Sequence, residues 1–251
     1  MRRCAPLWCK SNYSFLEGAS HPSELIEEAQ RLGHASIGIT DRDGVYGSVR
    51  AHIAAQELGV RLCIGSELSL DDGTTLVLLA QSRAGYANLC RLITRGRLRH
   101  EKGRCSVSYA EVCEHAPGLI GLWGGDRSAL VARRGYRADV AQQLEAFDDR
   151  LYAMLTRHRR AAEPAQEARL KERALALGLP LVATSEVLYH MASRRRLQDV
   201  LTCIRHGVSL SHAHTAIKPN AEHVLKSPRA LEALFEDDIA ALERSAEVAE
   251  R

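Results

Sequence analysis

The stretch that decides the fold is Ala35-Ser-Ile-Gly-Ile-Thr-Asp-Arg-Asp-Gly44, in which a short apolar run of strand character ends on the carboxylate of Asp41. Two other stretches repeat the arrangement: Ser11-Asn-Tyr-Ser-Phe-Leu-Glu-Gly18 carries Glu17, and Ile64-Gly-Ser-Glu67 carries Glu67. Strand ends converge in an α/β fold, and convergent carboxylates can build a divalent-metal site for phosphoester chemistry. The pattern predicts an α/β fold with an acidic cluster at one end of the sheet.

Size and composition set broad limits on the molecule. The 251 residues suffice for one large α/β domain, and a hydrophobic content of 45% supports a substantial core. The net charge of +3 permits a polyanionic partner without requiring one. Seven cysteines without a C-x-x-C pair, no signal-peptide pattern and no run of about 18 apolar residues favour a cytoplasmic protein without membrane contact.

Strand-like and helix-like segments alternate along the chain. Glycines end the helical patterns at residues 33, 59 and 178. This alternation predicts a parallel sheet covered by helices. The expected strands are 35–40, 60–64, 75–80, 119–123, 150–155 and 180–184, and the expected helices are 21–32 with Ser20 as N-cap, 47–58, 84–97, 140–146 and 164–177.

Several ordered motifs carry a resemblance to a known family. They are Lys10–Ser20, Gly38–Gly44, Ile64–Glu67, Leu76–Gln81, Gly85–Leu92 and the two runs Pro180–His190 and Ser193–Arg205. Together they resemble the PHP (polymerase and histidinol phosphatase) domain that opens bacterial C-family DNA polymerases, relatives of the DNA polymerase III alpha subunit. The last two runs resemble the error-prone branch, which serves translesion synthesis in DNA repair.

The resemblance implies a distorted (β/α)7 TIM-like barrel over residues 1–193. A helical C-terminal extension, residues 194–251, would lead toward a polymerase module that this sequence does not contain. The implied partners are that module, in the same or a separate chain, and in addition DNA and translesion accessory proteins. Nucleotidyl transfer itself would belong to the polymerase module.

The resemblance also implies where metal ligands would lie. In the family that this sequence resembles, a working site is a ring of ligands at the strand ends that holds up to three Zn²⁺ or Mn²⁺ ions. The positions here that keep a ligand-type side chain are Glu17, Asp41, Glu67 and Glu186, with His190 two residues beyond the last motif. The positions where this sequence departs from the family pattern are Trp8, Lys10, Arg42, Gly125 and Leu188.

These departures change the chemistry of the site. An indole does not ligate Zn²⁺, and the fixed positive charges of Lys10 and Arg42 repel a metal ion. We therefore expect a pseudo-active site in which salt bridges replace metals, with no cofactor; any ion bound would be Mg²⁺, Mn²⁺ or Zn²⁺. Two alternatives stay open: an active metal-dependent phosphoesterase, such as a 3′–5′ exonuclease or pyrophosphatase, and a free-standing phosphatase of the histidinol-phosphate kind. The carboxylates could also simply cap helices.

Two basic clusters are candidates for contact with nucleic acid or a neighbouring domain. The first includes Arg97, Arg99 and Lys102, and the second is Arg194-Arg195-Arg196. Such clusters bind phosphates in nucleic-acid-binding proteins. They also occur as solvated helix ends, where positive charge suits the helix dipole, and this alternative remains open for the first cluster.

Overall fold

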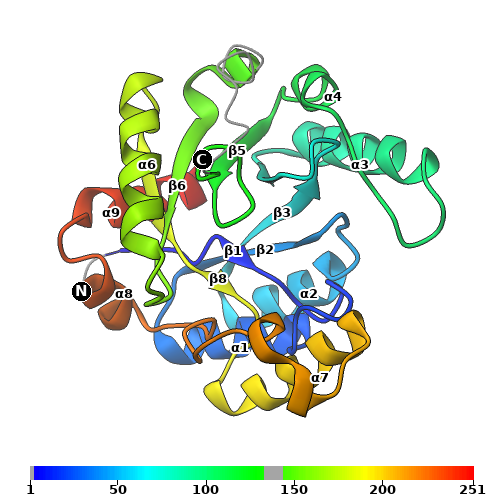
Figure 1. Ribbon diagram of the computed structural model, residues 1–251. Coiled ribbons are helices and arrows are strands. Elements are labelled where there is room, and N and C mark those ends of the chain that lie inside the picture. Colours follow the sequence, from blue (N-terminus) through cyan, green and yellow to red (C-terminus); the bar gives the residue numbers. More distant parts are fainter. Residues whose placement is uncertain (1–2, 133–143) are drawn as a thin grey trace.

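A single curved sheet forms the centre of the molecule (Figure 1). The computed structural model describes residues 3–132 and 144–251. The eight strands lie in the order β7-β6-β5-β4-β3-β2-β1-β8. Their bounds are β1 Trp8–Cys9, β2 Ser36–Arg42, β3 Arg61–Ser69, β4 Thr75–Ala80, β5 Leu119–Gly124, β6 Leu151–Thr156, β7 Leu181–Thr184 and β8 Glu186–Val187.

The sheet closes almost completely into a barrel. β7 and β8 stand at opposite ends of the strand order, yet only Ser185 separates them in sequence. The hydroxyl of Thr184 in β7 accepts a hydrogen bond from the backbone of Leu7, next to β1, at 3.1 Å. The predicted distorted TIM-like barrel is therefore confirmed.

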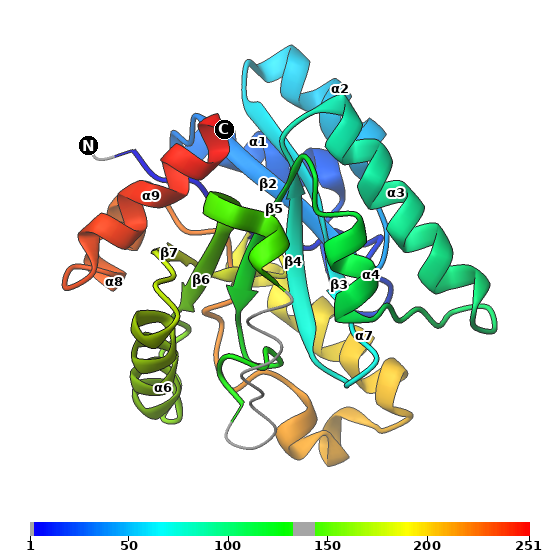
Figure 2. The same ribbon diagram turned by 90° about the horizontal axis from the view of Figure 1, so that it is seen from above.

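The helices lie around this sheet, as Figures 1 and 2 show. Most of them follow a strand, as the alternation in the sequence predicts. The helices are α1 Pro22–Leu32, α2 Ser48–Leu58, α3 Arg83–Leu98, α4 Tyr109–Glu114, α6 Glu163–Ala176, α7 Arg195–His206, α8 Pro228–Leu234 and α9 Ile239–Glu250. Of the helix expected at 140–146, residues 140–143 lie outside the described residues, and a 3-10 helix occupies Leu144–Arg150.

The expectation of a purely parallel sheet is wrong at β4. This strand pairs antiparallel with both β3 and β5, whereas the other neighbouring pairs among the described strands are parallel. The cause is the short turn between β3 and β4, where Gly73 takes the left-handed φ of +82° and Thr74 donates its N–H to the Asp72 carboxylate. A connection of this length makes a hairpin and leaves no room for a crossover helix. The remaining strands still deliver their carboxyl ends to one side.

The amino end of the barrel is closed by α9. Its residues Val248 and Ala249 join a buried cluster with alternate residues of β4 and β5, such as Val77 and Ile120. Ser245 of α9 accepts a hydrogen bond from the backbone of Ala5, before β1, at 2.9 Å. The interior is thus filled with apolar side chains at this end, and polar groups gather at the opposite end, where the strands finish.

The segment from residue 194 onward contains α7, α8 and α9, with loops and short 3-10 turns between α7 and α8, and it contacts the barrel. The domain boundary at 193/194 stays a prediction. In the described ranges, no helix has the length and apolar character that a membrane crossing requires.

Candidate functional site

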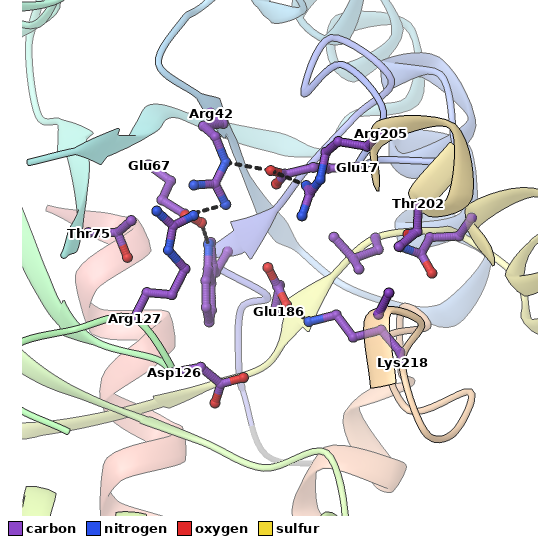
Figure 3. A pocket seen from close by; sticks show the side chains of 14 residues that line it. Glu17, Arg42, Glu67, Thr75, Asp126, Arg127, Glu186, Thr202, Arg205 and Lys218 are labelled. Atoms are coloured by element: carbon purple, nitrogen blue, oxygen red, sulfur yellow. Dashed lines mark hydrogen bonds and ion pairs between the residues drawn. The ribbon is translucent and has the colours of Figure 1, made fainter. Parts of the chain in front are cut away.

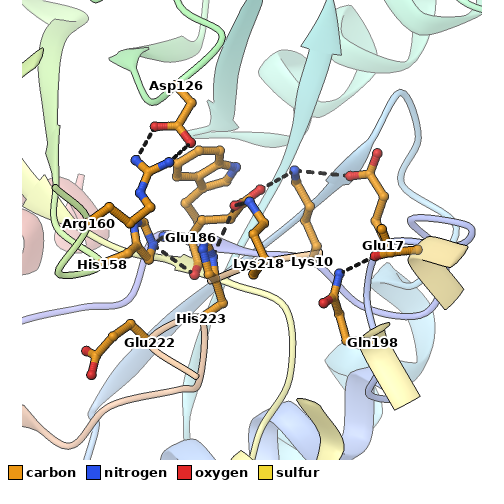
Figure 4. A network of polar contacts seen from close by, with 12 residues as sticks. Lys10, Glu17, Asp126, His158, Arg160, Glu186, Gln198, Lys218, Glu222 and His223 are labelled. Atoms are coloured by element: carbon orange, nitrogen blue, oxygen red, sulfur yellow. Dashed lines mark hydrogen bonds and ion pairs between the residues drawn. The ribbon is translucent and has the colours of Figure 1, made fainter. Parts of the chain in front are cut away.

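Lys10 lies at the centre of the carboxyl end of the barrel. It follows β1 directly, and its side chain is only 1% exposed. Its ammonium nitrogen lies 2.7 Å from Glu67, 2.7 Å from Glu186 and 3.2 Å from Glu17 (Figure 4 shows the last two side chains). One buried cation therefore joins carboxylates from β3, β8 and the loop after β1.

Arg42 supplies a second cation to the same carboxylates. It ends β2, and its guanidinium contacts Glu17 at 2.7 Å and Glu67 at 2.9 Å (Figure 3). The indole nitrogen of Trp8 donates a hydrogen bond of 2.7 Å to Glu67. Gly125 makes room for this indole, because a Cβ there would stand 2.6 Å from the Trp8 ring. Trp8 and Gly125, two positions at which the resemblance predicts lost ligands, thus fit one another sterically.

Residues of the C-terminal segment complete the cluster. Arg205 of α7 binds Glu17 at 2.6 Å, Lys218 binds Glu186 at 3.0 Å, and His223 Nδ1 lies 3.2 Å from Glu186. Both oxygens of all three glutamates consequently contact Lys10, Arg42 or one of these three residues.

The charges in this cluster stabilise one another. Burial alone would raise the pKa of Glu17, but Lys10, Arg42 and Arg205 hold it below its ordinary value. The pKa of Glu186 lies well below its ordinary value because Lys10 and Lys218 outweigh its burial. Burial would lower the pKa of Lys10, yet the neighbouring carboxylates raise it. These groups are ionised at neutral pH.

Two of the predicted ligand-type residues, Asp41 and His190, lie outside this ion-pair cluster. Asp41 accepts hydrogen bonds from the backbone N–H and hydroxyl of Ser11, both at 2.7 Å, and from the Ser14 hydroxyl at 2.6 Å. It fixes the loop after β1, and burial raises its pKa. His190 pairs through Nδ1 with the Ser20 hydroxyl at 2.7 Å. Leu188, a departure from the family pattern, lines the cavity described below without a polar group.

The sequence reasoning missed a pair of buried histidines. His158 and His223 stack with ring centroids 4.0 Å apart. His158 Nε2 accepts the backbone N–H of Glu186 at 3.0 Å, which orients β8. His158 follows β6 just as the predicted acids follow their strands, so the same rule could have found it. His223 comes from a loop, and no local pattern marks it.

Several residues of the two basic clusters have structural partners. Arg97 donates to the Asp43 carbonyl at 2.8 Å, and Arg99 pairs with Glu111. In the second cluster Arg194 pairs with Glu24 of α1. Arg195 donates to the Lys218 carbonyl at 3.1 Å. Lys102 and Arg196 are exposed, so the assignment of these clusters to DNA or domain contacts stays a prediction.

A group with metal-like spacing occurs elsewhere. Within the described residues, Glu167, Asp237 and Asp238 place carboxylate oxygens within 4.8 Å of one another. Arg157 contacts all three, and Lys171 contacts two of them. Fixed cations therefore already neutralise this group.

A cavity of about 140 Å³ opens above the central ion-pair cluster (Figure 3). It is bounded by the ends of several strands and by the C-terminal segment. Its charged lining residues are Glu17, Arg42, Glu67, Asp126, Arg127, Glu186, Arg205 and Lys218.

Comparison with known proteins identifies the family. The sequence pattern described as "PHP domain" matches residues 7–163. The chain belongs to the PHP domain family. Curated relatives named error-prone DNA polymerase extend the similarity: one from Rhodopirellula baltica is 36% identical over 256 residues, which is 99% of this chain, and one from Anaeromyxobacter dehalogenans is 40% identical over 263 residues, also 99% of this chain. This PHP chain spans only 22% of the length of each.

Solved structures agree with the fold of this PHP domain. A crystal structure described as a "putative metal-dependent phosphoesterase" from Bifidobacterium adolescentis superposes with a TM-score of 0.54 at 17% identity. The match covers 93% of this chain and 96% of that one.

Replacing Lys10 with methionine should destabilise the PHP domain strongly. The variant keeps most of the length of the side chain but leaves two buried carboxylates, Glu67 and Glu186, and the partly buried Glu17 without their common cation. Removing one partner of a buried ion pair costs about 3–5 kcal/mol, and we expect a loss of this size in the free energy of unfolding measured with urea. Lys102→Met, at an exposed position, is the matched control. Equal urea midpoints for the two variants would contradict the central role of Lys10.

His223 should make the PHP domain sensitive to mild acid. Burial is the main cause that lowers its pKa from 6.5 to about 4, so the unfolded chain takes up a proton at higher pH than the folded chain. This contribution to stability is complete above pH ~6.5, and roughly 3 kcal/mol is lost as the pH falls toward 4. We expect His223→Gln to flatten the unfolding free energy between pH 6.5 and 4.5 relative to the parent chain. The control His52→Gln, on the exposed face of α2, should show the same dependence of the unfolding free energy on pH as the parent chain. The same dependence in His223→Gln would refute the role of His223 in acid sensitivity.

Proposed function

We propose that this chain is the PHP domain of an error-prone DNA polymerase of the DNA polymerase III alpha type and acts as a supporting and interaction domain with a degenerate metal site. The relatives support the polymerase context, because they carry that name and match over 99% of the chain. Since the chain spans 22% of their length, the polymerase module would lie in the remaining part or in a separate chain. DNA and accessory proteins of translesion synthesis are further proposed partners.

The observation that carries the proposal is the occupation of the carboxylates by fixed cations. A divalent ion needs unshared oxygen or nitrogen ligands around an open position. Here Lys10 lies between Glu17, Glu67 and Glu186, and every oxygen of these three groups contacts Lys10, Arg42, Arg205, Lys218 or His223. The residues present therefore do not fit a divalent metal, and we derive no catalytic step through one.

The rival function, an active metal-dependent phosphoesterase, has some support. The carboxylates do converge, and the similar crystal structure is described as a metal-dependent enzyme. Hard oxygen ligands suit Mg²⁺ and Mn²⁺. Binding of such an ion would nevertheless require Lys10 and Arg42 to leave their carboxylates, and both are held in place by ion pairs within the barrel end.

A hydrolysis assay separates the two functions. We expect the purified chain with Mn²⁺ or Zn²⁺ to release no product above the blank from end-labelled single-stranded DNA or from a nitrophenyl phosphate ester. Metal-dependent turnover that disappears in Glu67→Gln and persists in Glu101→Gln, an exposed acid, would establish the phosphoesterase and overturn our proposal.

A further inference from the structure

The cavity above the ion-pair cluster carries an excess of positive charge. Three carboxylates, those of Glu17, Glu67 and Glu186, belong to the cluster. Asp126, a further acid at the cavity wall, is paired with Arg160. Six cationic side chains surround these four carboxylates: Arg42, Arg127, Arg205 and Lys218 line the cavity, Lys10 lies in the cluster beneath it, and Arg160 holds Asp126. The balance favours an anionic ligand.

Arg127 differs from the other cations that line the cavity, because Arg42, Arg205 and Lys218 are each paired with a carboxylate. Its backbone is held in place, because its carbonyl accepts the N–H of Thr75 at 3.1 Å. Its side chain is exposed and makes no hydrogen bond or ion pair with any residue in 3–132 or 144–251. Figure 3 shows the Arg127 side chain directed into the cavity. A planar guanidinium of this kind binds phosphate oxygens through paired N–H donors.

An open groove of about 490 Å³ continues from the cavity. Arg42, Arg127 and Arg205 line both spaces, so they stand at the junction between them. The groove adds Arg104 and the imidazole of His100 to this basic lining. Its one further acid, Asp43, is buried and accepts hydrogen bonds from the backbone and hydroxyl of Ser69 at 2.7 and 2.8 Å.

We propose that the cavity is a binding site for a phosphate group, held without a metal by Arg127 together with Arg42 and Arg205. The cavity of about 140 Å³ is well below the roughly 300 Å³ of ordinary small-molecule sites, which suits one phosphate and not a whole nucleotide. The rest of a longer ligand, such as a nucleic-acid strand, lies in the basic groove. Arg42 and Arg205 also pair with Glu17, so Arg127 is the guanidinium among these three that has no side-chain partner in the described residues. The inference rests on the proposed function, a site without metals.

The test is a binding titration in the presence of EDTA, which excludes metal-mediated contacts. Inorganic phosphate is added in a sulfate-free buffer, and the ionic strength is kept constant with chloride. Tryptophan fluorescence reports binding because Trp8 lines the cavity. We expect saturable binding that Arg127→Ala weakens about tenfold or more, as expected for loss of a charge-assisted hydrogen bond. Arg83→Ala, exposed on α3, should bind as the parent does.

The Arg127→Ala variant should also keep the melting temperature of the parent, because its guanidinium has no partner in the described part of the chain. A short single-stranded oligonucleotide with a terminal phosphate, compared with its unphosphorylated form, identifies the source of the phosphate. If the phosphorylated strand binds more tightly and Arg104→Ala weakens its binding, the ligand is a strand end. If inorganic phosphate binds as tightly as the phosphorylated strand and Arg104→Ala has no effect, the ligand is the free ion.

Two results would overturn the phosphate site: no saturable binding, or equal binding by the parent and Arg127→Ala. If either occurs while the chain stays inactive with added metals, the phosphate site alone is refuted. Metal-dependent hydrolysis would instead refute the proposed function.

Discussion

The structure depends on one buried ammonium group. Lys10 connects Glu17 of the loop after β1 with Glu67 of β3 and Glu186 of β8, so a single charge ties together the carboxyl end of the barrel. Burying charges is costly, and a buried ion pair is not in itself evidence of net stabilisation. The cost is offset here because every carboxylate oxygen has a partner. Removing one cation would leave a carboxylate of this cluster without its ion pair, and that loss would cost more free energy of folding than burying the complete cluster does.

The surrounding residues are consistent with this central cation. Gly125 admits the Trp8 indole, whose N–H adds a donor to Glu67. Lys218 and His223 reach Glu186 from the C-terminal segment, so that segment contributes to the cluster as well as to the packing of the barrel. Charge, shape and hydrogen bonding therefore agree in this cluster, as expected for a structure that its sequence specifies consistently.

Much of this arrangement could be predicted from the sequence, because strand ends converge in a barrel. The convergence of Glu17, Glu67 and Glu186 follows from that rule together with the family resemblance, and so do the salt bridges that Lys10 and Arg42 make with them. The turn Asp71-Asp72-Gly73 before β4 is a hairpin signal, so the antiparallel direction of β4 could also have been predicted. The regular alternation of strands and helices elsewhere favoured a parallel sheet instead. The separate role of Asp41 depends on the loop conformation that brings Ser11 and Ser14 to it. The contribution of His223 depends on long-range packing, which no local pattern encodes.

We propose that side-chain cations occupy the positions of metal ions in this PHP domain. The most direct measurement is the metal content of the chain, purified without chelators, equilibrated with Zn²⁺ and Mn²⁺ and then desalted, by elemental mass spectrometry. We predict far less than one ion per chain. One or more tightly bound ions per chain, lost on replacement of Glu67 by glutamine, would contradict the account.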